Sequence, residues 1–285
     1  MRILIIGGAG MLGHQLWRHF HQSHEVWVTL RKPVSAYARF GLFDKDRAIS
    51  GIDVSNAEAL LPVFRRARPD AVINCVGIVK QLQEAKNPII SLTINSLLPH
   101  RLSELCGATG ARLVHISTDC VFSGRKGNYS EADPSDAEDL YGRTKFLGEL
   151  HESHCVTIRT SIIGRELETK SGLIEWFLSQ SGKSINGFRK VIYTGFTTQE
   201  LARIIERVLV QCPALGGLWQ VGSDAISKYE LLKFAQEAFA WKGEIIPDDN
   251  LILDRSMNST RFRQETGYQP PSWESMIREM SQSPA

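Results

Sequence analysis

A short apolar run that ends in a glycine-rich turn, at the very start of the chain, constrains the fold more than any other feature. Arg2–Ile6 is apolar at almost every position, which is typical of a strand buried on both faces. It leads into Gly7-Gly8-Ala9-Gly10-Met11-Leu12-Gly13 and then into helix-like sequence carrying Leu16 and Phe20. A strand, a glycine turn and a helix in this order predict the first βα unit of a parallel sheet.

The glycine turn is suited to a dinucleotide. Glycines let the chain turn tightly and let backbone N–H groups approach a pyrophosphate, and a helix N-terminus adds partial positive charge. The spacing Gly7-x-x-Gly10-x-x-Gly13 differs from the G-x-G-x-x-G fingerprint, so a tight turn without a ligand is the alternative. The residues that we expect to bind the cofactor here are Gly7, Gly10, Met11, Leu12 and Gly13.

Further strand-like and helix-like segments alternate up to about residue 160. Strands are predicted at 25–30, 49–52, 71–75, 112–116 and 156–159. Between them lie predicted helices, among them one from about 88 to 108 and one that carries Tyr141 and runs to about His154. Repeated βαβ alternation predicts an α/β fold, a Rossmann-type doubly wound parallel sheet with helices on both faces.

Beyond Thr160 the pattern loosens. Helix-like segments occur near 171–181, 198–211, 228–240 and 273–280, with a strand at 217–221. We therefore expect a Rossmann domain over residues 1–160 and a smaller α/β substrate-binding region over residues 161–285. Parts of the chain near 198–221 are expected to return to the first sheet.

The end of the second strand indicates which dinucleotide binds. NAD-specific Rossmann folds place an acidic residue here to hold the ribose 2′-hydroxyl, whereas a basic residue accommodates a 2′-phosphate. This chain has Arg31 and Lys32 and no acid. The pair favours NADP, with NADPH preferred over NADH; the alternative is two solvated loop cations.

Other candidate contacts follow from the position of strand ends, because ligands of such sheets lie beyond the carboxyl ends of the strands. Asp53 and Val54 follow the third strand, where a short polar side chain could meet the adenine. Ser117-Thr118-Asp119 ends the fifth strand, so its hydroxyl groups are expected to face the cofactor crevice. Further predicted cofactor contacts are Cys75, Val76, Gly77 and Asn95.

Tyr141 and Lys145 stand four residues apart in a predicted helix and would share one face of it. A phenol has a pKa near 10 and exchanges protons poorly at pH 7, but a cation held beside it lowers that pKa. The pair therefore predicts acid/base chemistry. The spacing alone would also fit two residues on a solvated helix face.

Several motifs, in order, resemble those of the extended short-chain dehydrogenase/reductases. The Gly7-x-x-Gly10-x-x-Gly13 turn and the Tyr141-x-x-x-Lys145 pair are in that family's order. The closer similarity is to its dTDP-4-dehydrorhamnose reductase branch. It covers roughly residues 1–165 and rests on the stretches Ser117-Thr118-Asp119-Cys120-Val121-Phe122-Ser123-Gly124, Tyr129-Ser130-Glu131-Ala132-Asp133, Tyr141 to Glu149 and Arg159-Thr160-Ser161, with Leu253-Asp254-Arg255-Ser256 and Ser259-Thr260-Arg261-Phe262 as weaker matches further on.

The resemblance implies hydride transfer from NADPH to C4 of a nucleotide-linked 4-keto-6-deoxysugar. Tyr141 would donate the proton, and Lys145 would lower its pKa and bind the nicotinamide ribose. Thr118 would hold the carbonyl oxygen. Homodimers are common in such enzymes, but the sequence does not give the oligomeric state. The expected substrate-binding residues are Thr118, Asp119, Cys120, Val121 and Trp176, where Trp176 could stack on the base or pack in a helix core.

Two departures from the branch and two alternative functions bear on the substrate. The branch usually has tyrosine where Cys120 stands, and proline near Ala137-Glu138-Asp139. Related dehydratases place Asp-Glu directly after the threonine; here Asp119 is followed by Cys120, which favours reduction over dehydration. An epimerase would need tightly held NAD, against which Arg31 and Lys32 speak. A protein that binds NADP and a partner without turnover, as in the regulatory subunit of methionine adenosyltransferase, stays open.

Composition excludes several other classes. The net charge of +2, without a long basic block, does not favour nucleic acid or an anionic membrane as partner. No apolar run approaches the length of a membrane span, and the four apolar residues before Gly7 are too few for a signal peptide. Five scattered cysteines without a Cys-x-x-Cys motif suggest reduced thiols in a cytoplasmic protein and no metal site.

Overall fold

The structure, a computed structural model, describes residues 1–283. The chain divides into two compact units. The first unit contains Met1–Ser117, Asp139–Ile158 and Ala202–Leu218. The second unit contains Thr118–Glu138, Arg159–Leu201 and the chain from Trp219 onward.

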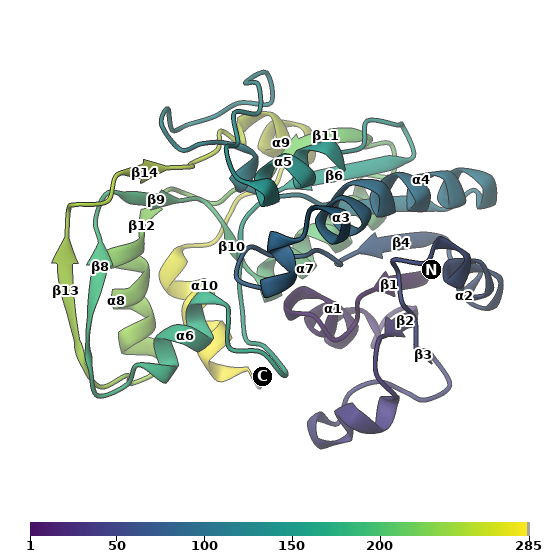
Figure 1. Ribbon diagram of the computed structural model, residues 1–285, viewed down its shortest axis with the longest axis horizontal. Coiled ribbons are helices and arrows are strands. Elements are labelled where there is room, and N and C mark those ends of the chain that lie inside the picture. The colour runs from purple at the N-terminus through teal and green to yellow at the C-terminus, as the bar shows by residue number, and fades with distance from the viewer. Residues whose placement is uncertain (284–285) are drawn as a thin grey trace. The chain divides into compact units, whose positions relative to one another are not determined.

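A seven-stranded sheet with the order β11-β6-β5-β4-β1-β2-β3 forms the core of the first unit (Figure 1). Adjacent strands from β6 to β3 all pair in parallel. This confirms the predicted Rossmann-type α/β fold. The strands are β1 Arg2–Ile6, β2 Glu25–Leu30, β3 Ala48–Ser50, β4 Ala71–Asn74, β5 Arg112–Ile116, β6 Cys155–Arg159 and β11 Gly217–Gln220.

Helices cover both faces of β1. Leu4 and Ile6 pack in one apolar cluster with Val63 of α2 (Leu60–Ala67) and Leu102 of α4 (Leu98–Thr109). Successive side chains of a strand point to opposite faces, so Ile3 and Ile5 point the other way, yet they too are fully buried. Helix α1, Met11–Phe20, contacts β1 and β2. Burial on both sides explains why the first strand is almost entirely apolar.

The helix predicted at about 88–108 is interrupted. The structure has α3 at Pro88–Ser91, a π-helical segment at Leu92–Leu97 and then α4. Pro99 has no N–H and cannot donate to the carbonyl of Asn95, four residues earlier, so the regular hydrogen-bond pattern fails at that carbonyl. The apolar periodicity of the sequence predicted one continuous helix, and the effect of this proline on its hydrogen bonds was missed.

The helix that carries Tyr141 is shorter than predicted. α5 spans Leu140–Leu147 rather than reaching about His154. Gly148 follows it, and a Cβ atom there would lie 2.0 Å from the Asn95 carbonyl oxygen. The close approach of Gly148 to the π-helical segment therefore requires glycine, and the chain leaves the helix there.

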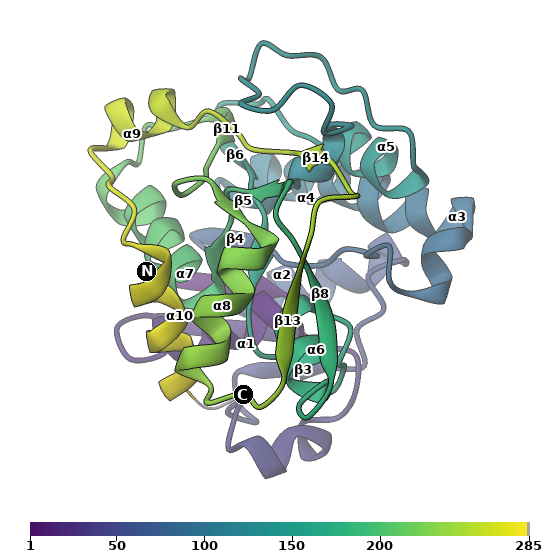
Figure 2. The same ribbon diagram turned by 90° about the vertical axis from the view of Figure 1, so that its left-hand side faces the viewer.

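The second unit is built from short strands in small sheets. β8 Ser184–Phe188 pairs with β13 Glu244–Asp248 in parallel, and Figure 2 shows them beside α8, Lys228–Ala238. β9 Val191–Tyr193 lies between β12 Ile226–Ser227 and β14 Leu253–Asp254. β7 Ile162–Ile163 pairs with β10 Phe196–Thr197. None of these short strands was predicted, because two to five residues show no clear alternation.

The remaining helices include one that the sequence did not reveal. α6 Leu173–Ser179, α7 Thr198–Glu206 and α10 Trp273–Gln282 correspond to predicted helices, whereas α9 Thr260–Thr266 was missed. A π-helical segment, Arg207–Gln211, continues α7. Within residues 1–283, no helix combines the length and apolar character needed to cross a membrane.

The two units do not meet at residue 160, where the sequence placed its boundary. Residues 202–218 belong to the first unit, and residues 118–138 belong to the second. The reason is visible at Tyr129, whose N–H donates to the Ser256 carbonyl at 2.9 Å and whose carbonyl accepts from Asn258 at 2.7 Å. Thr118 therefore lies in the second unit, and Tyr141 and Lys145 lie in the first.

Candidate functional site

The glycine turn of the first unit is as tight as its spacing predicted. Gly7 has a φ of +89°, and its carbonyl oxygen accepts the N–H of Gly10 at 3.1 Å. A Cβ on Gly13 would lie 2.1 Å from the same oxygen. The first turn of α1 follows and no side chain caps it, so its N–H groups face outward from a helix N-terminus. This arrangement can hold a phosphate group.

Thr29 joins the glycine turn to the end of β2. Its hydroxyl accepts the N–H of Gly7 at 3.0 Å, and its carbonyl accepts the N–H of Gly8 at 3.0 Å. Arg31 and Lys32 follow directly and are exposed. Sequence reasoning did not identify Thr29; its signal is a hydroxyl residue near the end of an otherwise apolar strand.

Asp53 lies after β3, within electrostatic reach of Arg31. Its Oδ1 accepts the backbone N–H of Ser55 at 3.0 Å and the Ser55 hydroxyl at 2.8 Å. The Ser55 hydrogen bonds, with a contribution from Arg31, lower the pKa of this carboxyl. Asp53 is therefore an anion near Arg31, one of the two cations predicted to bind the 2′-phosphate. Asp53 and Val54 both follow the carboxyl end of β3.

The segment after β4 packs against the glycine turn. A Cβ on Gly7 would lie 2.7 Å from Cγ2 of Val76, so these two predicted cofactor segments are in contact. Cys75 and Gly77 flank Val76, and burial raises the pKa of the Cys75 thiol. The backbone of this loop thus lies beside the turn that would hold the pyrophosphate.

Asn95 connects that loop to the helix of Tyr141. Its Oδ1 accepts the N–H of Ile78 at 2.8 Å, and its Nδ2 donates to the Ile78 carbonyl at 3.0 Å and to the Thr144 hydroxyl at 3.2 Å. These hydrogen bonds join the loop after β4 to α5. The role of Asn95 as a cofactor contact stays a prediction.

Tyr141 and Lys145 both lie on α5. Asp139 caps the helix by accepting the N–H of Gly142 at 2.7 Å. Tyr141 is half-buried, whereas Lys145 is only 4% exposed and donates from Nζ to the Ile116 carbonyl at 2.7 Å. Burial, opposed by Glu149, lowers the pKa of Lys145 to about 8. The amine is thus held at the carboxyl end of β5 and can change its charge near neutral pH.

Sequence reasoning missed two polar residues beneath Lys145. His115 of β5 lies with its Nε2 3.4 Å from Lys145 Nζ and its Nδ1 3.1 Å from Asn74 Nδ2. Both residues are fully buried. Burial, followed by the charge of Lys145, lowers the pKa of His115 far below its usual value. Their signal in the sequence was a polar residue near the end of each of two apolar strands.

In the second unit, the Thr118 segment has its own polar contacts. The Thr118 hydroxyl lies 3.2 Å from Asp119 Oδ1 and accepts the N–H of Cys120 at 3.1 Å. Arg255 donates from Nε to the Phe122 carbonyl at 2.8 Å and from Nη1 to Cys120 Sγ at 3.5 Å. Arg255 belongs to the Leu253-Asp254-Arg255-Ser256 stretch, so that weak motif match lies against this segment.

Val121 follows Cys120 and is fully buried, whereas Trp176 lies on α6. Trp176 is 39% exposed while Phe177 beside it is buried. The sequence left two roles open for Trp176, and packing in the helix core is one of them. In the structure, Phe177 rather than Trp176 packs in the core. Stacking on a base stays a prediction.

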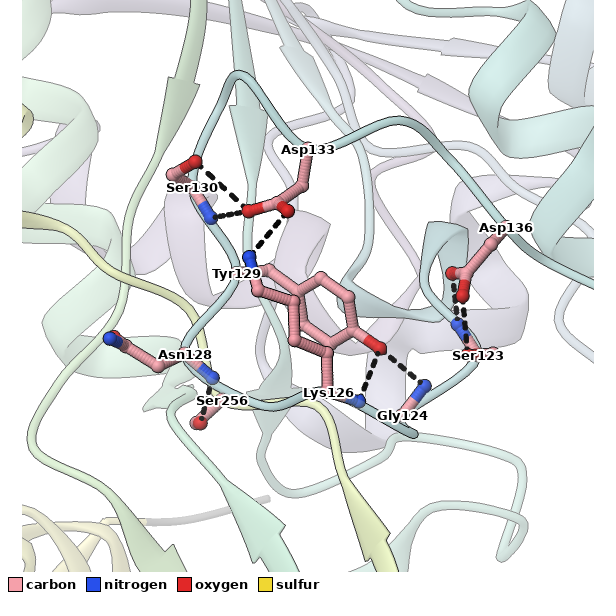
Figure 3. A network of polar contacts seen from close by, with 9 residues as sticks. All are labelled: Ser123, Gly124, Lys126, Asn128, Tyr129, Ser130, Asp133, Asp136 and Ser256. Carbon is pink, nitrogen blue, oxygen red and sulfur yellow. Dashed lines mark hydrogen bonds and ion pairs between the residues drawn. The ribbon is translucent and has the colours of Figure 1, made fainter.

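A hydrogen-bonded loop supports the Thr118 segment (Figure 3). The Tyr129 hydroxyl accepts the N–H groups of Gly124 and Lys126, each at 3.1 Å, and its ring stacks on Phe122 with centroids 4.1 Å apart. Asp136 accepts both the N–H and the hydroxyl of Ser123 at 2.6 Å. The loop is therefore ordered by its own contacts despite its content of Gly, Ser, Asp and Pro.

The two units carry different parts of the predicted site. The first unit brings together the predicted cofactor residues and the Tyr141–Lys145 pair, and the second carries the predicted substrate residues. In the part of the chain that the structure describes, no cluster of His, Cys, Asp and Glu could hold a metal ion.

Comparison with protein families gives a match over residues 1–284 to the model described as RmlD substrate binding domain. A dTDP-4-dehydrorhamnose reductase of Streptomyces griseus is 29% identical over 149 residues, covering 52% of this chain and 43% of that protein. Methionine adenosyltransferase 2 subunit beta of Rattus norvegicus is 28% identical over 150 residues, covering 52% of this chain and 41% of that protein. The matched stretch is thus less than half of each of these relatives.

Matches over nearly the whole chain also occur. The spore coat polysaccharide biosynthesis protein SpsK of Bacillus subtilis is 24% identical over 300 residues, covering 99% of this chain and 97% of that protein. A hypothetical dTDP-4-dehydrorhamnose reductase from Sulfolobus tokodaii has a similar structure, with a TM-score of 0.77, 26% identity, and 97% and 99% coverage. The Bacillus anthracis dTDP-4-dehydrorhamnose reductase, in complex with NADP, has a TM-score of 0.80 at 22% identity, with 98% of each chain covered.

Proposed function

The chain belongs to the RmlD substrate binding domain family, and we propose that it is an NADPH-dependent reductase of a nucleotide-linked 4-keto-6-deoxysugar. The observation that carries the proposal is the buried amine of Lys145, anchored on the Ile116 carbonyl one helical turn from Tyr141. Relatives named dTDP-4-dehydrorhamnose reductase and dTDP-4-keto-6-deoxy-D-glucose reductase support the substrate class.

The residues of the first unit fit an NADP cofactor. A Cβ on Gly13 would lie 2.1 Å from the Gly7 carbonyl oxygen, so the absence of a side chain there lets the N-terminus of α1 pack closely against the turn that would hold the pyrophosphate. The uncapped N-terminus of α1 would receive the negative charge, and Arg31 and Lys32 would bind the 2′-phosphate. The similar Bacillus anthracis structure was obtained in complex with NADP.

The proposed mechanism assigns one role to each catalytic residue. When bound, NADPH supplies the hydride that reduces the ketone carbon. Tyr141 donates its phenolic proton to the carbonyl oxygen, and the Lys145 ammonium lowers the pKa of that phenol. The Thr118 hydroxyl donates a hydrogen bond to the same oxygen. Cys120 follows Asp119 where a dehydratase would carry glutamate, which favours reduction.

The direct test is a screen of dTDP- and UDP-linked 4-keto-6-deoxysugars with NADPH, followed by the loss of absorbance of the reduced nicotinamide. The proposal expects oxidation of NADPH with at least one sugar nucleotide and a product reduced at C4. Tight binding of NADPH together with no turnover across the panel would contradict it.

The second candidate is a protein that binds NADP and a partner protein without turnover. It is favoured by the match to methionine adenosyltransferase 2 subunit beta of Rattus norvegicus, which is 28% identical over 52% of this chain, against 29% over 52% for the Streptomyces griseus reductase. Binding of NADPH without consumption in the screen above would support this candidate instead.

A further inference from the structure

Lys145 of α5 and two polar side chains of the sheet beneath it form a buried cluster whose hydrogen bonds must be assigned. Asn74 and His115 are fully buried, and Lys145 is 4% exposed. Asn74 of β4 stands directly opposite His115 of β5 in the sheet register. Buried polar groups are costly unless each donor meets an acceptor, so the direction of each hydrogen bond here is constrained.

The orientation of the Asn74 amide is fixed by the backbone. Its Oδ1 accepts the N–H of Val76 at 3.1 Å, so its Nδ2 is the atom that faces His115 Nδ1 at 3.1 Å. An amide nitrogen donates and cannot accept, which makes Nδ1 of His115 the acceptor. A neutral imidazole with an unprotonated Nδ1 carries its proton on Nε2. The Val76 N–H thus sets the tautomer of His115 through Asn74.

The protonated Nε2 of His115 points toward Lys145. Nε2 and Nζ are 3.4 Å apart. An ammonium at Nζ would meet another donor there, whereas an uncharged amine can accept the Nε2–H. The second contact of Nζ, the Ile116 carbonyl at 2.7 Å, can accept a hydrogen bond from either form. The geometry therefore favours the uncharged amine relative to an ordinary buried lysine.

The charged groups around the pair act in both directions. Glu149 of the chain after α5 favours the ammonium form of Lys145, and burial opposes it. Lys145 and His100 both disfavour a charge on His115. His115 therefore stays neutral and acts toward Lys145 only as a hydrogen-bond donor, while Lys145 is the group that changes its charge.

We propose that Asn74 and His115 are positioning residues that stabilise the uncharged form of Lys145, so that this lysine can return a proton to Tyr141 after each turnover. The proposal rests on the proposed reductase function. Tyr141 gives its phenolic proton to the substrate oxygen, and the Lys145 ammonium then gives a proton to the resulting phenolate. The lone pair left on Nζ accepts the hydrogen bond from His115 Nε2–H, and the amine regains a proton from water.

The substitution Asn74→Asp reverses the direction of the hydrogen bond between residue 74 and His115 Nδ1. One carboxylate oxygen can still accept the Val76 N–H, and the other would accept a hydrogen bond from a protonated His115 Nδ1. The ring would then present an unprotonated Nε2 to Lys145 and favour the ammonium. We expect nitrogen NMR of the histidine rings to show the Nε2–H form of His115 in the natural protein and the Nδ1–H form in the variant. His115→Gln assigns the signal.

The same variant should raise the pKa of the Lys145 amine, followed by NMR, by about one unit or more. The basic limb of the kcat profile for NADPH oxidation should move to higher pH by the same amount. Asn87→Asp is the matched control, since Asn87 caps α3 by accepting the N–H of Ile89 at 3.0 Å and aspartate can do the same. It adds the same charge and should move neither titration.

Two results would overturn the proposal: an Nδ1–H tautomer of His115 in the natural protein, or a changed tautomer in Asn74→Asp with an unmoved Lys145 titration. If no sugar nucleotide is reduced, the proposed function fails, while the two NMR titrations still decide this inference. If Asn74→Asp does not fold, the tautomer of the natural protein decides it.

Discussion

The candidate residues of the first unit lie on or beside a buried parallel sheet, whereas Thr118 to Val121 of the second unit precede a loop held by hydrogen bonds. Lys145 is fixed through Ile116 and His115 of one central strand. Thr118 is followed by a loop whose order depends on Tyr129 and Asp136. Loops on a rigid scaffold tolerate change better than the scaffold does. We therefore expect the first unit to fix the chemistry and the second to adjust the choice of substrate.

The largest expected effect comes from the first unit. Tyr141→Phe removes the proposed proton donor, and turnover should fall by about 10²- to 10⁴-fold, the usual contribution of a general acid. NADPH affinity, measured by fluorescence titration, should change little. Tyr229→Phe, at another half-buried tyrosine, serves as control. Near-normal turnover of Tyr141→Phe would show that Tyr141 is not the proton donor and that the first unit does not supply this step.

The next effect concerns cofactor choice. Replacing Arg31 and Lys32 with alanine should weaken NADPH binding by about tenfold or more, because hydrogen bonds to charged groups contribute about 1.5–3 kcal/mol each. NADH binding should be nearly unchanged. Equal losses for the two cofactors in parallel titrations would show that these residues do not bind a 2′-phosphate.

A glycine tests how rigid the first unit is. Gly148→Ala places a Cβ 2.0 Å from the Asn95 carbonyl oxygen, so the backbone must move. Overpacking of this kind typically lowers the free energy of unfolding by about 1–3 kcal/mol. Urea unfolding of the variant measures this loss. Gly107→Ala in α4, where the nearest atom would lie 3.5 Å from the new Cβ, should be neutral or stabilising. A silent Gly148→Ala would mean that α5 is less firmly placed than its contacts indicate.

In the second unit, Tyr129→Phe removes the acceptor of two backbone N–H groups. Loss of this acceptor should lower the free energy of unfolding by about 1–3 kcal/mol if those N–H groups stay buried. Under the proposed function, the KM for the sugar nucleotide should rise while NADPH affinity stays constant. A change in NADPH affinity instead would break the division of labour between the two units.

Acid should affect the two units at different pH. Burial lowers the pKa of His14 to about 4 and that of His115 well below 6.5, so the unfolded chain binds these protons first and stability falls as pH drops below about 6.5. In the second unit, hydrogen bonds lower the pKa of Asp133 to about 2, so its contacts are lost only in stronger acid. Hydrogen exchange at pH 5 should therefore show loosening in the first unit before the second; the reverse order would refute this.

Prediction from the sequence succeeded where a local pattern and the fold agree. The apolar run of β1, the glycine turn and the later βα units predicted the parallel sheet. It failed where a distant contact decides. The end of α5 at Leu147 depends on the approach of Gly148 to Asn95. The π-helical segment is a different case, because Pro99 lies within the stretch that was predicted as one regular helix. The short strands of the second unit carry too few residues for a readable period.

The sequence by itself determined the fold class, the glycine turn, the cations after β2 and the Tyr141–Lys145 spacing, because each is a pattern within one or two neighbouring elements. Only the tertiary structure placed Asn74 and His115 under Lys145, because three separate segments must come together to make that contact. It also assigned Thr118 to a different unit from Tyr141, since Tyr129 pairs with residues far along the chain. Contacts between distant segments leave little trace in a single sequence, and here they set the protonation of the proposed catalytic lysine.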